Sequence, residues 1–235
     1  TACGKKPEAS TAAAPAAAQA IVIGLDDNFP PMGFRDDKGE LVGFDIDLAR
    51  EAGKRSGLEV SFKPIDWSAK EAELNGKRVD VLWNGLTITE ERKANILFTT
   101  PYLENHQIIV VADKSAITTK AQLAGKVVGV QDGSSAVDAI QKDADTAKSI
   151  KEIKKFGDNV TALMDLTTGR LNLLTYALIH RSGIGEIGVA VVGALPGQRP
   201  ATGLVGDAVG ALADQQHALP FLQRQCATVV LQQHQ

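Results

Sequence analysis

The chain of 235 residues has few of the residues that build metal centres or disulfide scaffolds. It contains two cysteines, Cys3 and Cys226, and its four histidines lie far apart, at positions 106, 180, 217 and 234. A structural zinc site needs closely spaced Cys and His ligands, and a disulfide framework needs several cysteine pairs. We therefore expect no metal and no cofactor in this protein.

The sequence also lacks an excess of charge and a long apolar segment. Its formal net charge is −3, so electrostatic attraction would not hold it on nucleic acid. No stretch approaches the roughly 20 consecutive apolar residues of a membrane-spanning helix. With 44% hydrophobic residues, the chain can fill the core of one large or two small domains. These features predict a globular protein that does not bind nucleic acid.

The motifs of several common enzyme classes are missing. The sequence has no Gly-x-Ser-x-Gly, no His-Glu-x-x-His and no Cys-x-x-Cys. Residues 129–135 place two glycines and two serines after an apolar run, but they lack the Gly-Lys-Ser/Thr ending that contacts nucleotide phosphates. The sequence therefore predicts a binding protein and not an enzyme.

The beginning of the chain differs in composition from its middle. Residues 1–20 are rich in Ala, Ser, Thr and Pro, which have little to bury, and they predict a flexible tether. Thr1 and Ala2 followed by Cys3 resemble the end of a bacterial lipoprotein signal peptide, in which the cysteine receives the lipid. We expect a lipid anchor on Cys3, and an unmodified thiol is the alternative.

Strand patterns and helix patterns alternate along the rest of the chain. Residues 20–25 and 127–130 are short apolar runs typical of buried strands, whereas residues 44–53 and 159–166 have helical spacing. Ser68 opens a Ser-x-x-Glu capping box, and Thr89 precedes a short charged helix. The alternation predicts an α/β protein with mostly parallel sheets, in two blocks at 21–111 and 112–200.

Two loops that follow predicted strands carry groups able to hold a small anion. In the first loop Gly85 exposes the backbone, Thr87 adds a hydroxyl, and Arg92 can fold back to contact a carboxylate in bidentate fashion. In the second loop Ser134 and Ser135 precede a predicted helix, whose first N–H groups can bind a carboxylate. A solvated charge for Arg92 and a plain helix cap for Ser134 are the alternatives. Together the loops could bind an α-amino acid between the two blocks.

Three segments resemble the polar amino-acid substrate-binding proteins of bacterial ABC importers: residues 39–49, 84–92 and 128–135. They occur in the family's order and spacing, and the resemblance covers about residues 20–170. It implies a two-lobed type II periplasmic binding protein that closes over its ligand by hinge motion. It also implies ABC-transporter permease subunits as partners and a location outside the cytoplasmic membrane, either lipid-anchored or periplasmic. A cyclohexadienyl or prephenate-type dehydratase on the same fold and a ligand-sensing lobe are the alternatives.

The resemblance also assigns roles to residues that would contact the ligand's α-carbon groups. It implies that Arg92 pairs with the α-carboxylate, helped by Thr87, and that Ser134 and Ser135 complete this contact when the lobes close. Gly85 and Thr87 would accept hydrogen bonds from the α-ammonium.

Other positions correspond to residues around the ligand side chain. Phe29 and Trp67 match the two aromatic residues that sandwich it, with core packing as the alternative. Asp26 matches a position that contacts its polar tip, and Asn84 and Gln131 lie at the same cleft. Because Asp26 would repel an acidic side chain, glutamine or a basic amino acid is the favoured ligand.

The resemblance ends after Arg170. The family usually continues with a strand whose last residue is an aspartate that binds the α-ammonium, and by register this place falls on Ala177. The lysine-rich helix and the tryptophan-containing end that return to the first lobe are unrecognisable, so a return over residues 201–235 is doubtful. We interpret this tail as altered, for example by a frameshift. Sequencing the parent gene tests this interpretation, and an intact frame with homologous tails elsewhere would contradict it.

Overall fold

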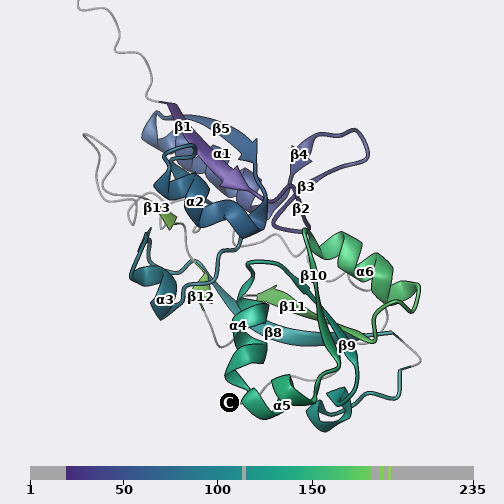
Figure 1. Ribbon diagram of the computed structural model, residues 1–235. Coiled ribbons are helices and arrows are strands. Elements are labelled where there is room, and N and C mark those ends of the chain that lie inside the picture. Colours follow the sequence, from purple (N-terminus) through teal and green to yellow (C-terminus); the bar gives the residue numbers. More distant parts are fainter. Residues whose placement is uncertain (1–19, 113–114, 181–185, 188–189, 192–235) are drawn as a thin grey trace, which may run out of the picture.

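The computed structural model describes residues 20–112, 115–180, 186–187 and 190–191. In these residues two five-stranded sheets and one small three-stranded sheet are joined by helices (Figure 1). We call the first five-stranded sheet with its helices and the small sheet the first lobe, and the second five-stranded sheet with its helices the second lobe. The tether, Cys3 and residues 201–235 lie outside the described residues.

The first sheet has the strand order β5-β1-β6-β13-β7. Its strands are β1 (Ala20–Leu25), β5 (Glu59–Pro64), β6 (Val81–Leu82), β7 (Leu97–Phe98) and β13 (Ala190–Val191). The central strand β1 pairs in parallel with β5 and β6, whereas β13 is antiparallel to β6 and β7. Both faces of β1 are covered, which explains its continuous apolar sequence.

Helices cover the two sides of this sheet. They are α1 (Phe44–Ser56), η1 (Trp67–Ala69), α2 (Lys70–Asn75) and α3 (Glu90–Lys93). Ile21 and Ile23 pack with Leu48 of α1, while Val22 packs against the cluster that contains Leu74 of α2. Thr89 caps α3 as predicted, because its side chain accepts a hydrogen bond from the Arg92 backbone N–H.

The second sheet has the strand order β10-β9-β11-β8-β12. Its strands are β8 (Leu103–Val111), β9 (Val127–Gln131), β10 (Glu152–Phe156), β11 (Leu173–His180) and β12 (Glu186–Ile187). Its helices are η2 (Lys120–Leu123), α4 (Ser135–Lys142), α5 (Ala144–Ser149) and α6 (Asn159–Thr167). Successive residues of β8 face opposite sides: Ile109 packs with Ile140 of α4, and Ile108 packs with the cluster around Leu166 of α6.

The small antiparallel sheet connects the lobes. It consists of β2 (Asn28–Phe29), β3 (Gly33–Arg35) and β4 (Leu41–Val42). Phe29 and Met32 belong to the same apolar cluster as Tyr176 of the second lobe, and the two rings of Phe29 and Tyr176 lie 5.9 Å apart. The Tyr176 hydroxyl donates to the backbone oxygen of Pro30 at 3.1 Å. Figure 1 places this sheet beside α6.

The structure confirms the α/β class with two lobes and differs from the sequence predictions in three details. The predicted boundary at residue 111 puts β8 in the first lobe, but β8 pairs with β11 over eight residues and lies in the second sheet. That pairing is antiparallel, so the second sheet is mixed. Ser68 does not cap α2: Asp66 accepts from the Ser68 backbone N–H and caps η1 instead. Within the described residues, no helix is both long and apolar enough to cross a membrane.

Candidate ligand-binding site

A cavity lies where the two lobes meet. Together with the space that is open to solvent, it comprises about 430 Å³. Nine of the ten residues that the sequence predicts as ligand contacts line it: Phe29, Trp67, Asn84, Gly85, Thr87, Arg92, Gln131, Ser134 and Ser135. The tenth, Asp26, is not among its lining residues.

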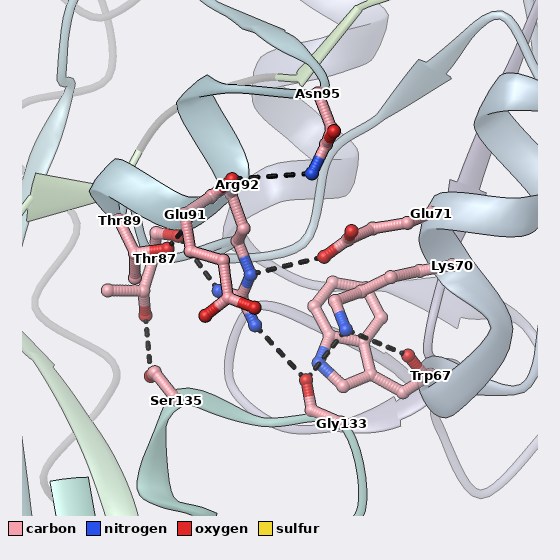
Figure 2. A network of polar contacts seen from close by, with 10 residues as sticks. All are labelled: Trp67, Lys70, Glu71, Thr87, Thr89, Glu91, Arg92, Asn95, Gly133 and Ser135. Atoms are coloured by element: carbon pink, nitrogen blue, oxygen red, sulfur yellow. Dashed lines mark hydrogen bonds and ion pairs between the residues drawn. The ribbon is translucent and has the colours of Figure 1, made fainter. Parts of the chain in front are cut away.

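Arg92 presents a buried guanidinium at the cavity wall, and its side chain is 8% exposed. Its Nη1 donates to the Thr87 backbone oxygen at 2.9 Å, its Nη2 to the Gly133 backbone oxygen at 3.1 Å, and its Nε lies 3.4 Å from a carboxylate oxygen of Glu71 (Figure 2). Burial lowers the pKa of Arg92, and the Glu71 carboxylate opposes this shift. The guanidinium stays cationic, because arginine is not deprotonated in proteins. Since a guanidinium has five N–H groups, one on each terminal nitrogen remains for a ligand carboxylate.

The Gly133 backbone oxygen also accepts from a second cation of the first lobe. Lys70 is 3% exposed, and its Nζ donates to this oxygen at 2.6 Å and to the Trp67 backbone oxygen at 3.2 Å. Figure 2 shows Lys70 and Arg92 converging on the Gly133 backbone oxygen. Burial lowers the pKa of Lys70 to about 8, and the neighbouring Arg92 charge adds to this effect. The loop that contains Gly133 is therefore a contact point between the lobes.

Two hydroxyls and two amides form a second bridge between the lobes. Thr87 Oγ1 and Ser135 Oγ lie 3.0 Å apart, across the cavity wall. Asn105 Nδ2 donates to Thr87 Oγ1 and Gln107 Nε2 donates to Ser135 Oγ, both at 2.9 Å. Asn105 and Gln107 are alternate residues of β8 on one face of the strand. Gln107, which lines the cavity, is not among the predicted contacts; residues 104–107 are all polar, so no alternation in the sequence distinguishes it.

A third polar chain runs behind the cavity wall. Asp26 is 7% exposed and accepts from Gln131 Nε2 at 2.6 Å and from the Asn28 backbone N–H at 2.9 Å. Gln131 Oε1 in turn accepts from Asn159 Nδ2 at 2.8 Å. Burial raises the pKa of Asp26 to about 6, against the lowering effect of these hydrogen bonds. Asp26 thus fixes the orientation of Gln131, which reaches the cavity.

The two aromatic residues combine the roles that the sequence left open. Phe29 and Trp67 are each 7% exposed and line the cavity, and each belongs to an apolar core cluster. Lys70 Nζ lies 5.3 Å from the centre of the Trp67 ring, which is within the range of a cation–π contact. Both rings can therefore contact a ligand through one face while their other atoms pack in the core.

The helix start at α4 supplies backbone donors. Ser134 does not use its hydroxyl as a helix cap, because Oγ donates to the Gln131 backbone oxygen at 2.7 Å. Ser134, Ser135 and Ala136 line the cavity, so the first turn of α4, whose N–H groups lack partners within the helix, meets it. Thr175 and Ala177 of β11 also line the cavity. In the described part of the chain, no three His, Cys, Asp or Glu side chains gather as metal ligands.

The comparison with protein families agrees with this geometry. Residues 21–177 match the model of the bacterial extracellular solute-binding proteins, family 3. The chain belongs to this family. The resemblance that three sequence motifs indicated is therefore confirmed for the family, and the Thr87, Arg92 and Ser135 positions all lie within the matched residues.

Relatives of this family 3 protein include several binding proteins of known name. It is 31% identical over 66% of its length to the L-cystine-binding protein TcyJ of Escherichia coli (strain K12), and 35% identical over 69% to the histidine-binding periplasmic protein of Salmonella typhimurium (strain LT2). These matches cover 57% and 62% of the relatives, so the chain spans about three-fifths of their length. The structure resembles an ancestral arginine-binding protein bound to arginine, with a TM-score of 0.70, 31% identity and coverage of 88% and 97% of the two chains.

Proposed function

We propose that this protein is a non-enzymatic receptor that binds a polar L-amino acid between its lobes, outside the cytoplasmic membrane, and delivers it to the permease subunits of an ABC importer. The observation that carries the proposal is the buried guanidinium of Arg92 at the cavity wall, with two N–H groups left for a carboxylate. The hydroxyls of Thr87 and Ser135 lie beside it, one from each lobe. A ligand held by both lobes favours their closure.

The polar groups around the rest of the cavity favour a neutral polar side chain on the ligand. Asn84, Gln131 and Asn159 line it with amides, and no carboxylate is among its lining residues in the described part of the chain. A basic ligand would add a cation beside Arg92 and Lys70 without a facing acid, since Asp26 is held by Gln131. Of the ligands that the sequence favours, glutamine is therefore better supported than a basic amino acid, although relatives are named for histidine and arginine.

A thermal-shift screen of the purified protein tests the proposal. The panel contains the twenty amino acids, ornithine and cystine, and every compound that raises the melting temperature is then titrated by calorimetry. A ligand at about 1 mM with a Kd of about 1 µM should add about 4 kcal/mol of stability and raise the melting temperature by several degrees. Arg92→Ala should weaken binding by about a hundredfold, because it removes charge-assisted hydrogen bonds to the carboxylate.

The control for Arg92→Ala is Arg50→Ala, which removes an arginine of α1 outside the cavity. This variant should bind as the unmodified protein does. A cooperative melt that no amino acid shifts would contradict the proposed receptor function. Turnover of prephenate by the unmodified protein, lost in Arg92→Ala, would instead support the dehydratase alternative.

The description of the family as extracellular supports a location outside the cytoplasm. We keep the lipid anchor on Cys3 as a proposal, because the Thr-Ala-Cys sequence supports it and Cys3 lies outside the described residues. A lipid on this cysteine and the tether of residues 1–20 would keep the receptor near its transporter.

A further inference from the structure

Gln107 carries a buried hydrogen-bond acceptor that the protein itself does not use. Its side chain lines the cavity, and its Oε1 has no hydrogen-bond partner within the described part of the chain. Leaving a buried amide oxygen without a donor is unfavourable, so such an atom in a cavity points to a ligand that supplies an N–H or O–H group.

The neighbouring hydroxyl engages the other end of this amide. Gln107 Nε2 donates to Ser135 Oγ, so Oε1 is the atom of the amide that has no partner within the described residues. The Thr87 and Ser135 hydroxyls share one hydrogen bond, and each also accepts from an amide. The two hydroxyls carry two protons, and one of these lies in the hydrogen bond between them. The other hydroxyl proton remains free to donate.

The network therefore offers the ligand two different groups close together. The free hydroxyl proton and the two remaining N–H groups of Arg92 require an acceptor, whereas Gln107 Oε1 requires a donor. Ser135 contacts both Thr87 and Gln107, so the two kinds of group are separated by a single hydroxyl. The carboxylate and the ammonium of an α-amino acid are attached to one carbon, and they need binding groups arranged in this way.

We propose that Gln107 Oε1 accepts a hydrogen bond from the α-ammonium of the ligand, so that a neutral amide of β8 performs this role in this protein. The assignment rests on the proposed function, because it requires an amino-acid ligand. Gln107 lies directly opposite Ala177 in the pairing of β8 with β11, and Ala177 has no polar side chain to compete for the ammonium. Gln107 is thus the partner, across the two strands, of the position at which the family usually has an aspartate.

Paired probes with and without the α-ammonium test the assignment. We would titrate the unmodified protein with L-glutamine and glutaramic acid, L-arginine and 5-guanidinopentanoic acid, and L-histidine and 3-(imidazol-4-yl)propanoic acid. The amino acid of a binding pair should bind at least about tenfold more tightly than its deamino partner, since a charge-assisted hydrogen bond is lost. Each variant below is first checked for a cooperative thermal melt.

Two substitutions at one position should have opposite effects. Gln107→Leu should weaken the amino acid by about tenfold and leave the deamino probe within about twofold. Gln107→Glu keeps an oxygen at this place and adds a negative charge, so it should hold or strengthen the amino acid and weaken the deamino carboxylate. Gln141→Leu, on the exposed side of α4, is the control and should change neither.

The outcomes separate this assignment from the proposed function. If both Gln107 variants weaken the amino acid and its deamino probe in parallel, Gln107 has only a structural role and the assignment is overturned while the receptor function stands. Equal affinity of the unmodified protein for both members of a pair also overturns it. If no amino acid of the thermal-shift panel binds the unmodified protein, the proposed function fails and the assignment fails with it.

Discussion

Asp26 is a buried carboxylate whose charge affects the stability of the protein. It is 7% exposed, and burial raises its pKa from 3.8 to about 6. The folded protein therefore binds more protons at this site than the unfolded chain between about pH 4 and 6. The stability that protonated Asp26 contributes to the folded protein is fully present below pH 3.8 and is lost as the pH rises through 6. Relative to Asp26→Asn, the free energy of unfolding should fall by about 2 kcal/mol between pH 4 and 7.

Urea unfolding at several pH values measures this difference. Asp37→Asn serves as the control, because it removes the carboxylate of an exposed turn residue. A difference between the unmodified protein and Asp26→Asn that does not change between pH 4 and 7 would contradict the buried, partly protonated state of Asp26.

Single residues could be placed at the cavity from the sequence where a loop follows a strand. Thr87 belongs to such a loop, and Arg92 and Ser135 lie in the short helix α3 and at the start of α4, which follow such loops. Gln107 could not be placed in this way, because it lies within β8 and reaches the cavity only through the antiparallel pairing with β11. Asp26 is not among the lining residues and binds Gln131 instead, through a hydrogen bond that spans 105 positions and that no local sequence pattern records.

At the scale of elements, the loop between β9 and α4 is built to approach the first lobe. Gly133 has a φ of +67°, and a Cβ there would lie 2.8 Å from the Ser68 Cα of η1. Gly133→Ala should therefore lose about 1 kcal/mol of stability from its backbone conformation and should also obstruct closure. We expect ligand affinity to fall at least about tenfold, as calorimetry with the best amino acid of the screen would measure.

Gly39→Ala is the matched control for this substitution. Gly39 has a φ of +80° in the turn before β4, and no atom lies within 4 Å of the Cβ position. This variant should lose a similar amount of stability and bind the ligand normally. Equal affinities for the two variants would show that the Gly133 loop does not restrict closure.

Long elements and caps were predictable, and very short strands were not. The helix from Phe44 is marked by early acids and late bases, and the cap at Thr89 by its position before charged residues. The strands of the small sheet have two or three residues each, too few for an alternating pattern to appear. The cap at Ser68 was wrong because Asp66, two residues earlier, accepts hydrogen bonds from both the backbone N–H and the hydroxyl of Ser68.

At the scale of the whole molecule, chain order predicted two lobes but not where the chain crosses between them. The sequence placed residues 103–111 with the preceding strands, whereas β8 pairs with β11, whose residues come more than 60 positions later. Pairing between distant segments depends on packing that no local pattern records. The same holds for the contacts that join the lobes at Gly133.

The contact between the lobes should also couple ligand binding to a proton. Lys70 is buried against Gly133, and burial lowers its pKa from 10.5 to about 8. Between pH 8 and 10.5 the closed protein therefore binds fewer protons than a form in which Lys70 is exposed to water. If ligand binding closes the lobes, part of a proton should leave Lys70 at pH 8.5. Calorimetry in two buffers of different ionisation enthalpy measures it. Lys70→Met should lack this release, exposed Lys142→Met should keep it, and equal release by all three proteins would refute the coupling.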